Sequence, residues 1–456
     1  MLALRRCLQW SLLALPLALA GCGGGGTGAG NASPLSIAAD GCGLQESKPW
    51  LLDYMQDQYL WYARMPNVDA SAYASLSSYF AALLYPGGSL EPSAPDLWSY
   101  VEPTASYEQF FSEGRTLGYG IAVAGLELKG RPTEALRIRY VEPNSPAAAA
   151  GLRRGDIVLS LNGVSSGEMI ARNDFSLLTP RAAGDYLDVR IRTAAGERVV
   201  TVAAAVFDLT PVSTSVVLHS AAGKSIGYLL VKDFIGQANA QLEEAYARFN
   251  AAGVSELVLD LRYNGGGLLF ISSQLAYMIA GSSASSGKTF NKLVYNDKRS
   301  KENELSKFIP YALTTDYRYD YSRPLPDLKL KRVTLLVDHG TASASEAVIN
   351  GLRGIDVIVN LIGSTTYGKP YGFTPQGNCG RYYFAVEFKG ENHKGFSAFD
   401  TGFAPNCSVR DDLNFQLGDV AEPRLAEALQ FLKSGQCTTA QWLVSRRWVH
   451  QSYFLM

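Results

Sequence analysis

Short apolar runs alternate with helical patterns over the second half of the chain. The runs Leu257–Leu261, Val333–Val337 and Val357–Leu361 are short and mostly apolar, which predicts buried strands. Apolar residues at helical spacing predict helices over Gln237–Ala251 and Leu268–Ala280. Because strands that alternate with helices are typical of a parallel sheet covered by helices, we predict an α/β domain over residues 218–437. The same reasoning predicts further strands at Ser225–Phe234 and Tyr382–Phe388, and a closing helix at Leu425–Leu432.

The first half of the chain has two other patterns. Aromatic and apolar residues at helical spacing over Lys48–Arg64, and less regularly over Ser71–Leu84, predict a small helical domain at residues 42–115. A Pro/Ser-rich break falls at Leu90–Pro95. Residues 116–207 then change to short strands with glycine turns, which predicts an inserted β-rich domain.

The beginning of the chain is typical of a secretory signal. Arg5 and Arg6 precede an apolar run, Trp10–Ala20, that is too short to cross a bilayer. Its end, Leu19-Ala20-Gly21-Cys22, resembles a bacterial lipobox. By that resemblance residues 1–21 are a lipoprotein signal peptide, Cys22 carries the lipid, and residues 22–41 are a flexible tether. The expected location is the periplasmic side of the cell envelope, at the outer membrane, since Gly23 is no retention signal of the Asp type. The alternative is a plain cleaved signal with an incidental cysteine.

Composition and cysteine content limit the classes of partner and of metal site that this chain is expected to have. A net charge of −1, with 47% hydrophobic and 18% charged residues, favours two or three globular domains and excludes nucleic acid as an expected partner. Four cysteines remain after Cys7 and Cys22 are set aside, which predicts two disulfides in an oxidising compartment. Of the three possible pairings we expect Cys379 with Cys407 and Cys42 with Cys437. Zinc is the rival interpretation, but no Cys-x-x-Cys pair occurs and the four histidines are scattered, so no metal is predicted.

A serine follows the predicted strand Val333–Val337, and a lysine follows the predicted strand Val357–Leu361. Ser343 lies at the predicted start of a helix, where the helix dipole and free N–H groups could stabilise an oxyanion. Lys369 could take the proton of that serine if burial lowers its pKa. The alternative is that Ser343 and Ser345 are helix N-caps, Glu346 completes a capping box, and Lys369 is a surface charge. His339 is the other candidate base, and we expect it to be structural.

A second glycine-rich turn, Tyr263-Asn264-Gly265-Gly266-Gly267, follows the strand Leu257–Leu261. In an α/β sheet such corners collect at the carboxyl ends of the strands, where sites form. Glycine permits close backbone approach, so this turn could donate an N–H to an oxyanion while the other corner presents the serine.

Three blocks together resemble the signatures of the C-terminal processing, or tail-specific, serine peptidases. They are Asp260–Gly267, Thr341–Glu346 and Thr366–Lys369. The resemblance implies a crotonase-like core of ββα units, Ser343 as nucleophile and Lys369 as general base. It implies an oxyanion hole at Gly266 and Ala344. Many members have a glutamine four positions after the lysine that orients its amine; here Phe373 stands there, and Gln376 is a candidate substitute.

The β-rich domain resembles a PDZ domain. The resemblance rests on Leu117–Ile121, Asn144–Ala147 and Ala150–Gly163. It implies that a loop holds the terminal carboxylate of a peptide, which adds beside it as a strand. The residues of that loop are Gly118, Tyr119, Gly120 and Ile121. The alternative is a packing module whose groove is blocked.

Three other segments have less definite interpretations. Residues 284–327 could form a lid or substrate wall, although a solvated insertion is favoured. Asp411, Asp412 and Asp419 are interpreted as a solvated turn rather than a metal cluster. The tail, residues 438–456, could contact a membrane surface or a partner.

These patterns predict a lipid-anchored serine endopeptidase of the envelope that cleaves proteins near their C-termini and needs no cofactor. Its expected partners are proteins or peptides with free C-termini, and the membrane through the lipid. The alternative is a non-catalytic adaptor that binds protein C-termini through the PDZ domain.

Overall fold

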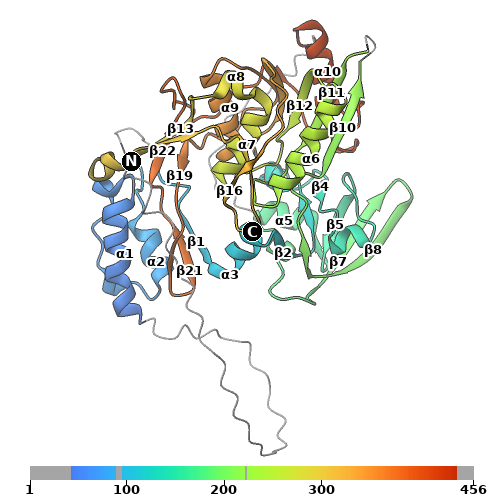
Figure 1. Ribbon diagram of the computed structural model, residues 1–456. Helices are drawn as coiled ribbons and strands as arrows, with labels where there is room; N and C mark the ends of the chain where they lie inside the picture. The colour runs from blue at the N-terminus through green and yellow to red at the C-terminus, as the bar shows by residue number, and fades with distance from the viewer. Residues whose placement is uncertain (1–42, 89–94, 221–222, 439–456) are drawn as a thin grey trace, which may run out of the picture. The chain divides into compact units, whose positions relative to one another are not determined.

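A computed structural model of the chain describes residues 43–88, 95–220 and 223–438 (Figure 1). The predicted signal peptide, Cys22, the tether, Cys42, most of the Pro/Ser-rich break and nearly all of the predicted tail lie outside these residues. Among the described helices, none is long and apolar enough to cross a bilayer.

A six-stranded sheet forms the centre of the peptidase region. Its order is β10-β11-β12-β17-β18-β23, with β10 antiparallel to β11 and all other neighbours parallel. The bounds are β10 Thr214–His219, β11 Ser225–Leu230, β12 Glu256–Asp260, β17 Arg332–Val337, β18 Ile358–Gly363 and β23 Cys407–Ser408. The predicted α/β sheet is therefore present, and its strands are the apolar runs.

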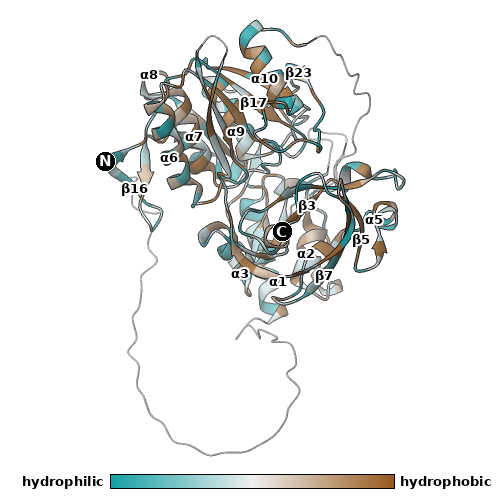
Figure 2. Cartoon of the chain, turned by 90° about the vertical axis from the view of Figure 1, so that its right-hand side faces the viewer, coloured by the Kyte–Doolittle hydropathy of each residue, from teal (hydrophilic) through white to brown (hydrophobic). Residues whose placement is uncertain are grey.

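The two faces of this sheet are covered by different helices. Residues of β17 alternate between two cores: Val333 and Leu335 join the core with the helices α6, α7 and α9, whereas Leu336 joins the core with α10. The helices are α6 Ala238–Ala251, α7 Leu269–Ala280, α9 Ala344–Gly354 and α10 Pro423–Ser434. Figure 2 shows the hydrophobic colouring of β17 between them. Burial on both faces explains why these strands are almost continuously apolar rather than alternating.

Two predicted strands differ from the structure. The strand predicted at Ser225–Phe234 ends at Leu230, and the residues after it leave the sheet to bond the glycine turn, with Phe234 N–H donating to Gly266 (3.0 Å). The run Tyr382–Phe388 is two strands, β21 Arg381–Phe384 and β22 Phe388–Glu391, which belong to different sheets. Apolar character alone did not reveal this bend.

The N-terminal helical region packs on the peptidase region. It has helices α1 Leu44–Gln58 and α2 Leu76–Leu83, short 3₁₀ turns η1 Tyr62–Arg64 and η2 Ala70–Ala72, and strand β1 Tyr100–Pro103. Strand β1 pairs with β21, and β21 with β20 (Gln376–Asn378), so α1 and α2 lie beside strands that follow Lys369 (Figure 1). The helix predicted to continue to Arg64 stops because Tyr59 is extended, with φ −64° and ψ 128°.

The predicted PDZ domain is a β-rich unit with short helices. Its main sheet has the order β3-β4-β5-β7-β8, with β6 beside β5, and β2 pairs separately with β9. The strands are β2 Arg115–Gly118, β3 Ile121–Val123, β4 Leu136–Val141, β5 Ile157–Leu161, β6 Val164–Ser165, β7 Tyr186–Thr193, β8 Gly196–Ala203 and β9 Ala205–Asp208. The helices and turns are α3 Thr104–Tyr107, η3 Glu108–Ser112, η4 Leu126–Leu128, α4 Pro146–Ala149, α5 Ser166–Arg172 and η5 Ser176–Leu178, of which α3 and η3 precede the domain.

The segment interpreted as a solvated insertion is only partly so. It contains α8 Ser282–Ser285, β13 Thr289–Tyr295, η6 Asp297–Glu302, β14 Glu304–Lys307, β15 Tyr311–Leu313 and β16 Tyr319–Pro324. Strand β13 is largely buried and pairs with β22, which also pairs with β19 (Tyr371–Gly372), directly after Lys369. Strands β14 and β16 are mostly exposed, whereas β13 is not, so the prediction was wrong for β13.

The predicted disulfide pairing is wrong. Cys407 is bonded to Cys437, with Cα atoms 5.5 Å apart, which excludes both Cys379–Cys407 and Cys42–Cys437. The reason is topological. Cys407 lies in the edge strand β23, and α10 packs on that part of the sheet. Cys437 follows α10 closely in the chain and therefore lies beside Cys407. Cys379 is also in a disulfide.

Candidate active site

The two predicted corners lie next to each other. Strands β12 and β17 are parallel neighbours, and each runs into a turn followed by a helix. Three hydrogen bonds join the turns: Ala342 N–H donates to Asn264 O (3.2 Å), Ser345 Oγ to Asn264 O (3.0 Å), and Thr341 Oγ1 to Leu261 O (2.9 Å). Ser345 is thus a buried structural hydroxyl, and Ser343 is the N-cap of α9.

Ser343 has an unusual backbone conformation. Its φ is 55° and its ψ −116°, which is rare for a residue with a side chain. Such strain persists only where the surroundings fix it, and it is concentrated at functional sites. Here the N–H of Ser343 donates to Glu346 Oε2 (3.1 Å), which is the predicted capping-box contact.

Glu346 also holds the lysine loop. Its Oε2 accepts the N–H of Lys369 (2.8 Å), and its Oε1 accepts the N–H of Gly368 (2.7 Å) and Oγ1 of Thr366 (2.7 Å). The carboxylate is fully buried, and burial raises its pKa to about 7 against the effect of these hydrogen bonds. One carboxylate oxygen therefore binds the amides of both Ser343 and Lys369, which places these two residues side by side.

Lys369 is a buried amine. Lys369 is only 4% exposed, and this burial lowers the pKa of its amine to about 7. The charges of Asp96 and Glu346 act in the opposite direction and raise the pKa. Its Nζ lies 4.2 Å from the centroid of the Phe373 ring. The surface-charge alternative is therefore wrong, and a large fraction of the amine is neutral at neutral pH, as a general base requires.

The predicted oxyanion donors differ in their contacts. Gly266 has φ 110°, and a Cβ on it would lie 2.8 Å from Ser343 Cβ and 3.0 Å from Ala344 N, so only glycine leaves this space open. Its own N–H donates to Asn264 Oδ1 (2.9 Å). Within the described residues the N–H of Ala344 has no acceptor, as expected in the first turn of a helix. Ala344 is therefore the available donor, and Gly266 is available only when its amide is released from Asn264.

Tyr263, at the start of the glycine turn, is held by a buried ionic network. It has φ 67°, its hydroxyl donates to Asp411 Oδ2, and Arg154 Nη1 donates to that hydroxyl (2.7 Å). Arg154 belongs to the PDZ region and also donates to Asp411 Oδ1 (2.6 Å). Asp411 is thus an arginine partner and not part of a solvated turn, so that prediction was wrong for this residue.

The other candidates have different partners. Gln376 Nε2 donates to Gln58 Oε1 of α1 (3.4 Å). The ring of His339 lies 5.3 Å from that of Tyr367. These contacts give neither residue a role in the chemistry.

The predicted carboxylate loop of the PDZ domain is fixed by its backbone. The carbonyl of Tyr119 accepts from Ala147 N–H (3.0 Å), and that of Gly120 accepts from Glu142 N–H (3.0 Å). Gly120 has φ 82°, and a Cβ there would lie 2.0 Å from Ser145 Cβ. Among the described strands β3 pairs only with β4, so no described strand is paired with its other edge.

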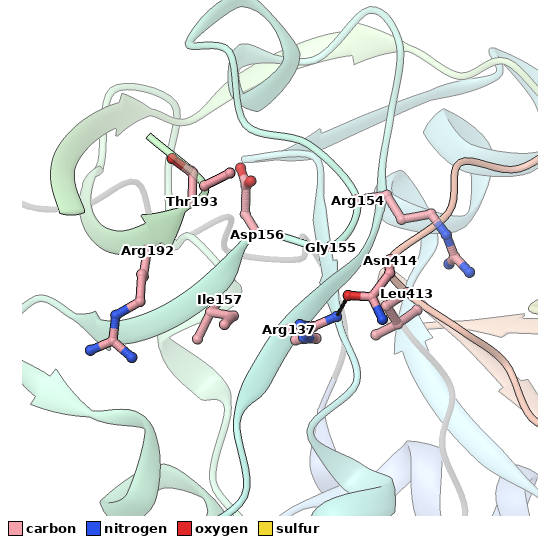
Figure 3. A pocket seen from close by; sticks show the side chains of 10 residues that line it. Arg137, Arg154, Gly155, Asp156, Ile157, Arg192, Thr193, Leu413 and Asn414 are labelled. Atoms are coloured by element: carbon pink, nitrogen blue, oxygen red, sulfur yellow. Dashed lines mark hydrogen bonds between the residues drawn. The ribbon is translucent and has the colours of Figure 1, made fainter. Parts of the chain in front are cut away.

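A group with metal-ligand spacing and a pocket both lie away from these turns. Among the described residues, the one group with metal-ligand spacing is Cys407, Glu427 and Cys437, and its cysteines are consumed by the disulfide. A pocket of about 340 Å³ lies between the PDZ region and residues 413–414. Figure 3 shows Arg137 bonded to Asn414 in its wall. None of its lining residues belongs to the serine, lysine or glycine turns.

Sequence reasoning missed several of these contacts. It recognised Glu346 only as a cap, and it assigned nothing to Asp96 or Arg154. The available signal was weak: a capping box cannot reveal that the same carboxylate reaches a second loop. A buried arginine likewise looks the same in sequence as an exposed one.

Comparison with known proteins agrees with this geometry. Residues 225–376 match the sequence model "Peptidase family S41", residues 46–100 "Peptidase S41 N-terminal domain", and residues 137–173 "PDZ domain". A carboxyl-terminal-processing protease of Synechocystis sp. is 27% identical over 248 residues, covering 54% of this chain and 52% of the relative. One of Picosynechococcus sp. is 25% identical over 265 residues, covering 58% of each. The chain thus spans just over half the length of these curated relatives.

Solved structures share the fold. A protein of Bacteroides fragilis described as an S41 protease has a TM-score of 0.62 at 25% identity, covering 84% of this chain and 97% of that one. The photosystem II D1 C-terminal processing protease has a TM-score of 0.50 at 19% identity, covering 86% and 98%. Residues 225–376 therefore match the model of peptidase family S41, and the chain has the S41 peptidase fold with a PDZ domain and an N-terminal helical region.

Proposed function

We propose that this chain is a serine endopeptidase that cleaves proteins near their C-termini through an acyl-enzyme. The single observation that carries the proposal is the shared carboxylate of Glu346, which binds the amides of Ser343 and Lys369 and joins a strained serine to a buried lysine. The names of the curated relatives support the same class of activity.

The mechanism assigns each group one task. Neutral Lys369 accepts the proton of Ser343 as its Oγ attacks the scissile carbonyl. The N–H of Ala344, with the glycine turn, stabilises the oxyanion. Lys369 then gives the proton to the leaving amine, the peptide bond breaks, and an ester remains on Ser343. Lys369 next takes a proton from water as the water oxygen attacks the ester carbonyl. The bond to Ser343 Oγ then breaks, Lys369 returns the proton to that oxygen, and the carboxylic acid is released.

Substrates are expected to need a free C-terminus. The loop at Gly118–Ile121 would bind the carboxylate, and the edge of β3 that pairs with no described strand would add the peptide as a strand. A peptide with a free C-terminus should therefore have a KM at least about tenfold lower than the same peptide with a C-terminal amide. A tenfold difference is roughly the effect of losing one charge-assisted hydrogen bond. Steady-state cleavage of the two peptides measures this. Equal KM values would support a blocked groove.

Activity should depend on the proton of Lys369. Since its pKa is about 7 and its neutral form is the base, kcat/KM should rise with pH around pH 7 and reach a plateau above about pH 8. Protonation of Glu346 should also lower kcat/KM, so the rise of kcat/KM with pH reports on Lys369 and Glu346 together. We call this rise the acid limb of the profile. A pH–rate profile tests this, with His339→Ala as control. If His339→Ala abolished the limb, histidine would be the base.

The proposed location is the cell envelope, with Cys22 as a lipid anchor. The support is the sequence pattern before Cys22 and its resemblance to a lipobox. Intact-mass analysis of the membrane fraction should find an acylated Cys22 at the N-terminus. An unmodified protein cleaved at another bond would reject the anchor.

A non-catalytic adaptor is the second candidate. Two features favour it: Phe373 stands where the family resemblance implies a glutamine, and the amide of Gly266 is hydrogen-bonded to Asn264. An adaptor would bind peptides with free C-termini, and Ser343→Ala would change nothing. Loss of peptide cleavage in Ser343→Ala, with binding retained, supports the endopeptidase.

A further inference from the structure

The amine of Lys369 faces the ring of Phe373, at the position where the family resemblance implies a glutamine. Its Nζ is 4.2 Å from the centroid of Phe373, a distance at which the ring face attracts a cation. A glutamine amide would orient the amine through a directional hydrogen bond. A ring instead fixes its position over one face and favours its charged form.

A second group that acts on this amine comes from the N-terminal helical region. Asp96 is buried, and its Oδ1 accepts the N–H groups of Trp98 (2.9 Å) and Ser99 (3.1 Å), while its Oδ2 accepts Tyr59 Oη (2.7 Å) and Ser99 Oγ (2.5 Å). Four donors hold this carboxylate in one orientation. Its charge favours the ammonium form of Lys369.

The segment that carries Asp96 is locked to the strand after the lysine. The ring of Trp98 lies 4.7 Å from that of Tyr371, and the ring of Trp61 lies 5.0 Å from it. Ser99 Oγ accepts the N–H of Val386 (2.9 Å). The segment that carries Asp96 is therefore packed against the strand that follows Lys369, and the charge of Asp96 acts on the amine.

The other charged groups around this site are committed elsewhere. On α9, Glu346 binds backbone amides. Asp400 binds Tyr371 Oη (2.6 Å) and Lys389 Nζ (3.1 Å), and Glu387 pairs with Arg299 (3.5 Å). The ring of His339 packs on Tyr367. Asp96 and Glu346 are the charges that act on the amine, and of these only Asp96 belongs to another region of the chain.

We propose that Asp96 and Phe373 are positioning residues for Lys369, and that the N-terminal helical region thereby completes the active site. This rests on the proposed Ser343–Lys369 chemistry. The buried carboxylate and the ring hold the amine in place of the glutamine. They also oppose the desolvation of the amine, so the lysine is not made neutral over the whole pH range.

The test compares two variants that remove one attraction each. Asp96→Asn keeps an oxygen for the N–H groups of Trp98 and Ser99 but removes the charge, and should move the acid limb of kcat/KM down by about one pH unit. Phe373→Leu keeps an apolar side chain beside the amine but removes the ring, and should move the acid limb of kcat/KM down by roughly half a pH unit. Both should lower the plateau kcat several-fold, since the amine is less well oriented. Asp400→Asn, which alters a nearby carboxylate that is paired with Lys389, should leave the limb in place.

A second measurement does not depend on hydrolysis. In a Ser343→Ala background, NMR titration of ¹³C-labelled lysine follows the Lys369 amine directly, assigned with Lys369→Arg. Asp96→Asn should lower its midpoint by the same amount. If the midpoint falls in Asp96→Asn but the wild-type protein cleaves no peptide, the positioning roles stand and the proposed function is rejected. Unchanged midpoints in both Asp96→Asn and Phe373→Leu would overturn the positioning roles even in an active enzyme. If Asp96→Asn does not fold, Phe373→Leu decides the outcome.

Discussion

Replacing Lys369 with methionine is expected to lower kcat/KM by about a thousandfold or more, the contribution of a general base. Methionine keeps the apolar stem in a buried site, so the fold and the melting temperature should be retained. The Glu346 carboxylate is not free to take the proton of Ser343 instead, because it is bound to four donors. Steady-state peptide cleavage measures the effect.

The matched control is Lys394→Ala. That lysine is half-exposed and pairs with Asp356 at the surface, so its loss should leave kcat/KM unchanged. If Lys369→Met kept more than a tenth of the activity, the lysine would not be the base. If Lys394→Ala lost activity too, the assay would be reporting on stability.

The second large effect is on stability. Arg262→Ala is expected to lower the free energy of unfolding by about 3–5 kcal/mol, the cost of breaking a buried ion pair from one side. Arg262 is fully buried, and its Nε donates to Asp260 (3.0 Å) while its Nη2 donates to Glu422 (2.7 Å). Both carboxylates are themselves fully buried, so alanine would leave two buried carboxylates without the cation that pairs with them. Urea denaturation of the two proteins measures the difference.

Arg323→Ala is the comparison for this effect. Its pair with Glu243 (2.7 Å) is partly exposed to solvent, so its loss should cost less than about 1 kcal/mol. Equal midpoints for Arg262→Ala and Arg323→Ala would show that the buried network around β12 contributes no more than a surface pair.

Much of the central fold follows from local patterns. The strands β12, β17 and β18 are short apolar runs because both faces of the sheet are covered, and the turns after them carry the glycines and small residues that sharp corners need. The positions of Ser343 and Lys369 on these corners were therefore predictable. The predicted fold class of the chain, with a PDZ domain and an N-terminal helical region, is confirmed.

What the sequence did not reveal are contacts between segments far apart. Asp96 and Lys369 are separated by most of the PDZ and peptidase regions, and no local pattern connects them. The same holds for Arg154 with Asp411, and for Cys407 with Cys437, where the pairing depends on which helix covers which sheet edge. Such contacts follow from topology, which hydrophobic periodicity does not specify.

The N-terminal region also changes the view of Phe373. From sequence, the missing glutamine favoured a non-catalytic chain. In the structure the ring contacts the amine, and Asp96 acts on the same amine. The substitution is therefore compatible with a working lysine, held by different groups.

The most direct test is the reaction of the protein with a fluorophosphonate, which labels only an activated serine, followed by peptide mapping. The account predicts one adduct, on Ser343, that forms faster as the pH rises through about 7 and is lost in Lys369→Met. No adduct on Ser343 in the folded wild-type protein, or an equal rate of labelling in Lys369→Met, would contradict it.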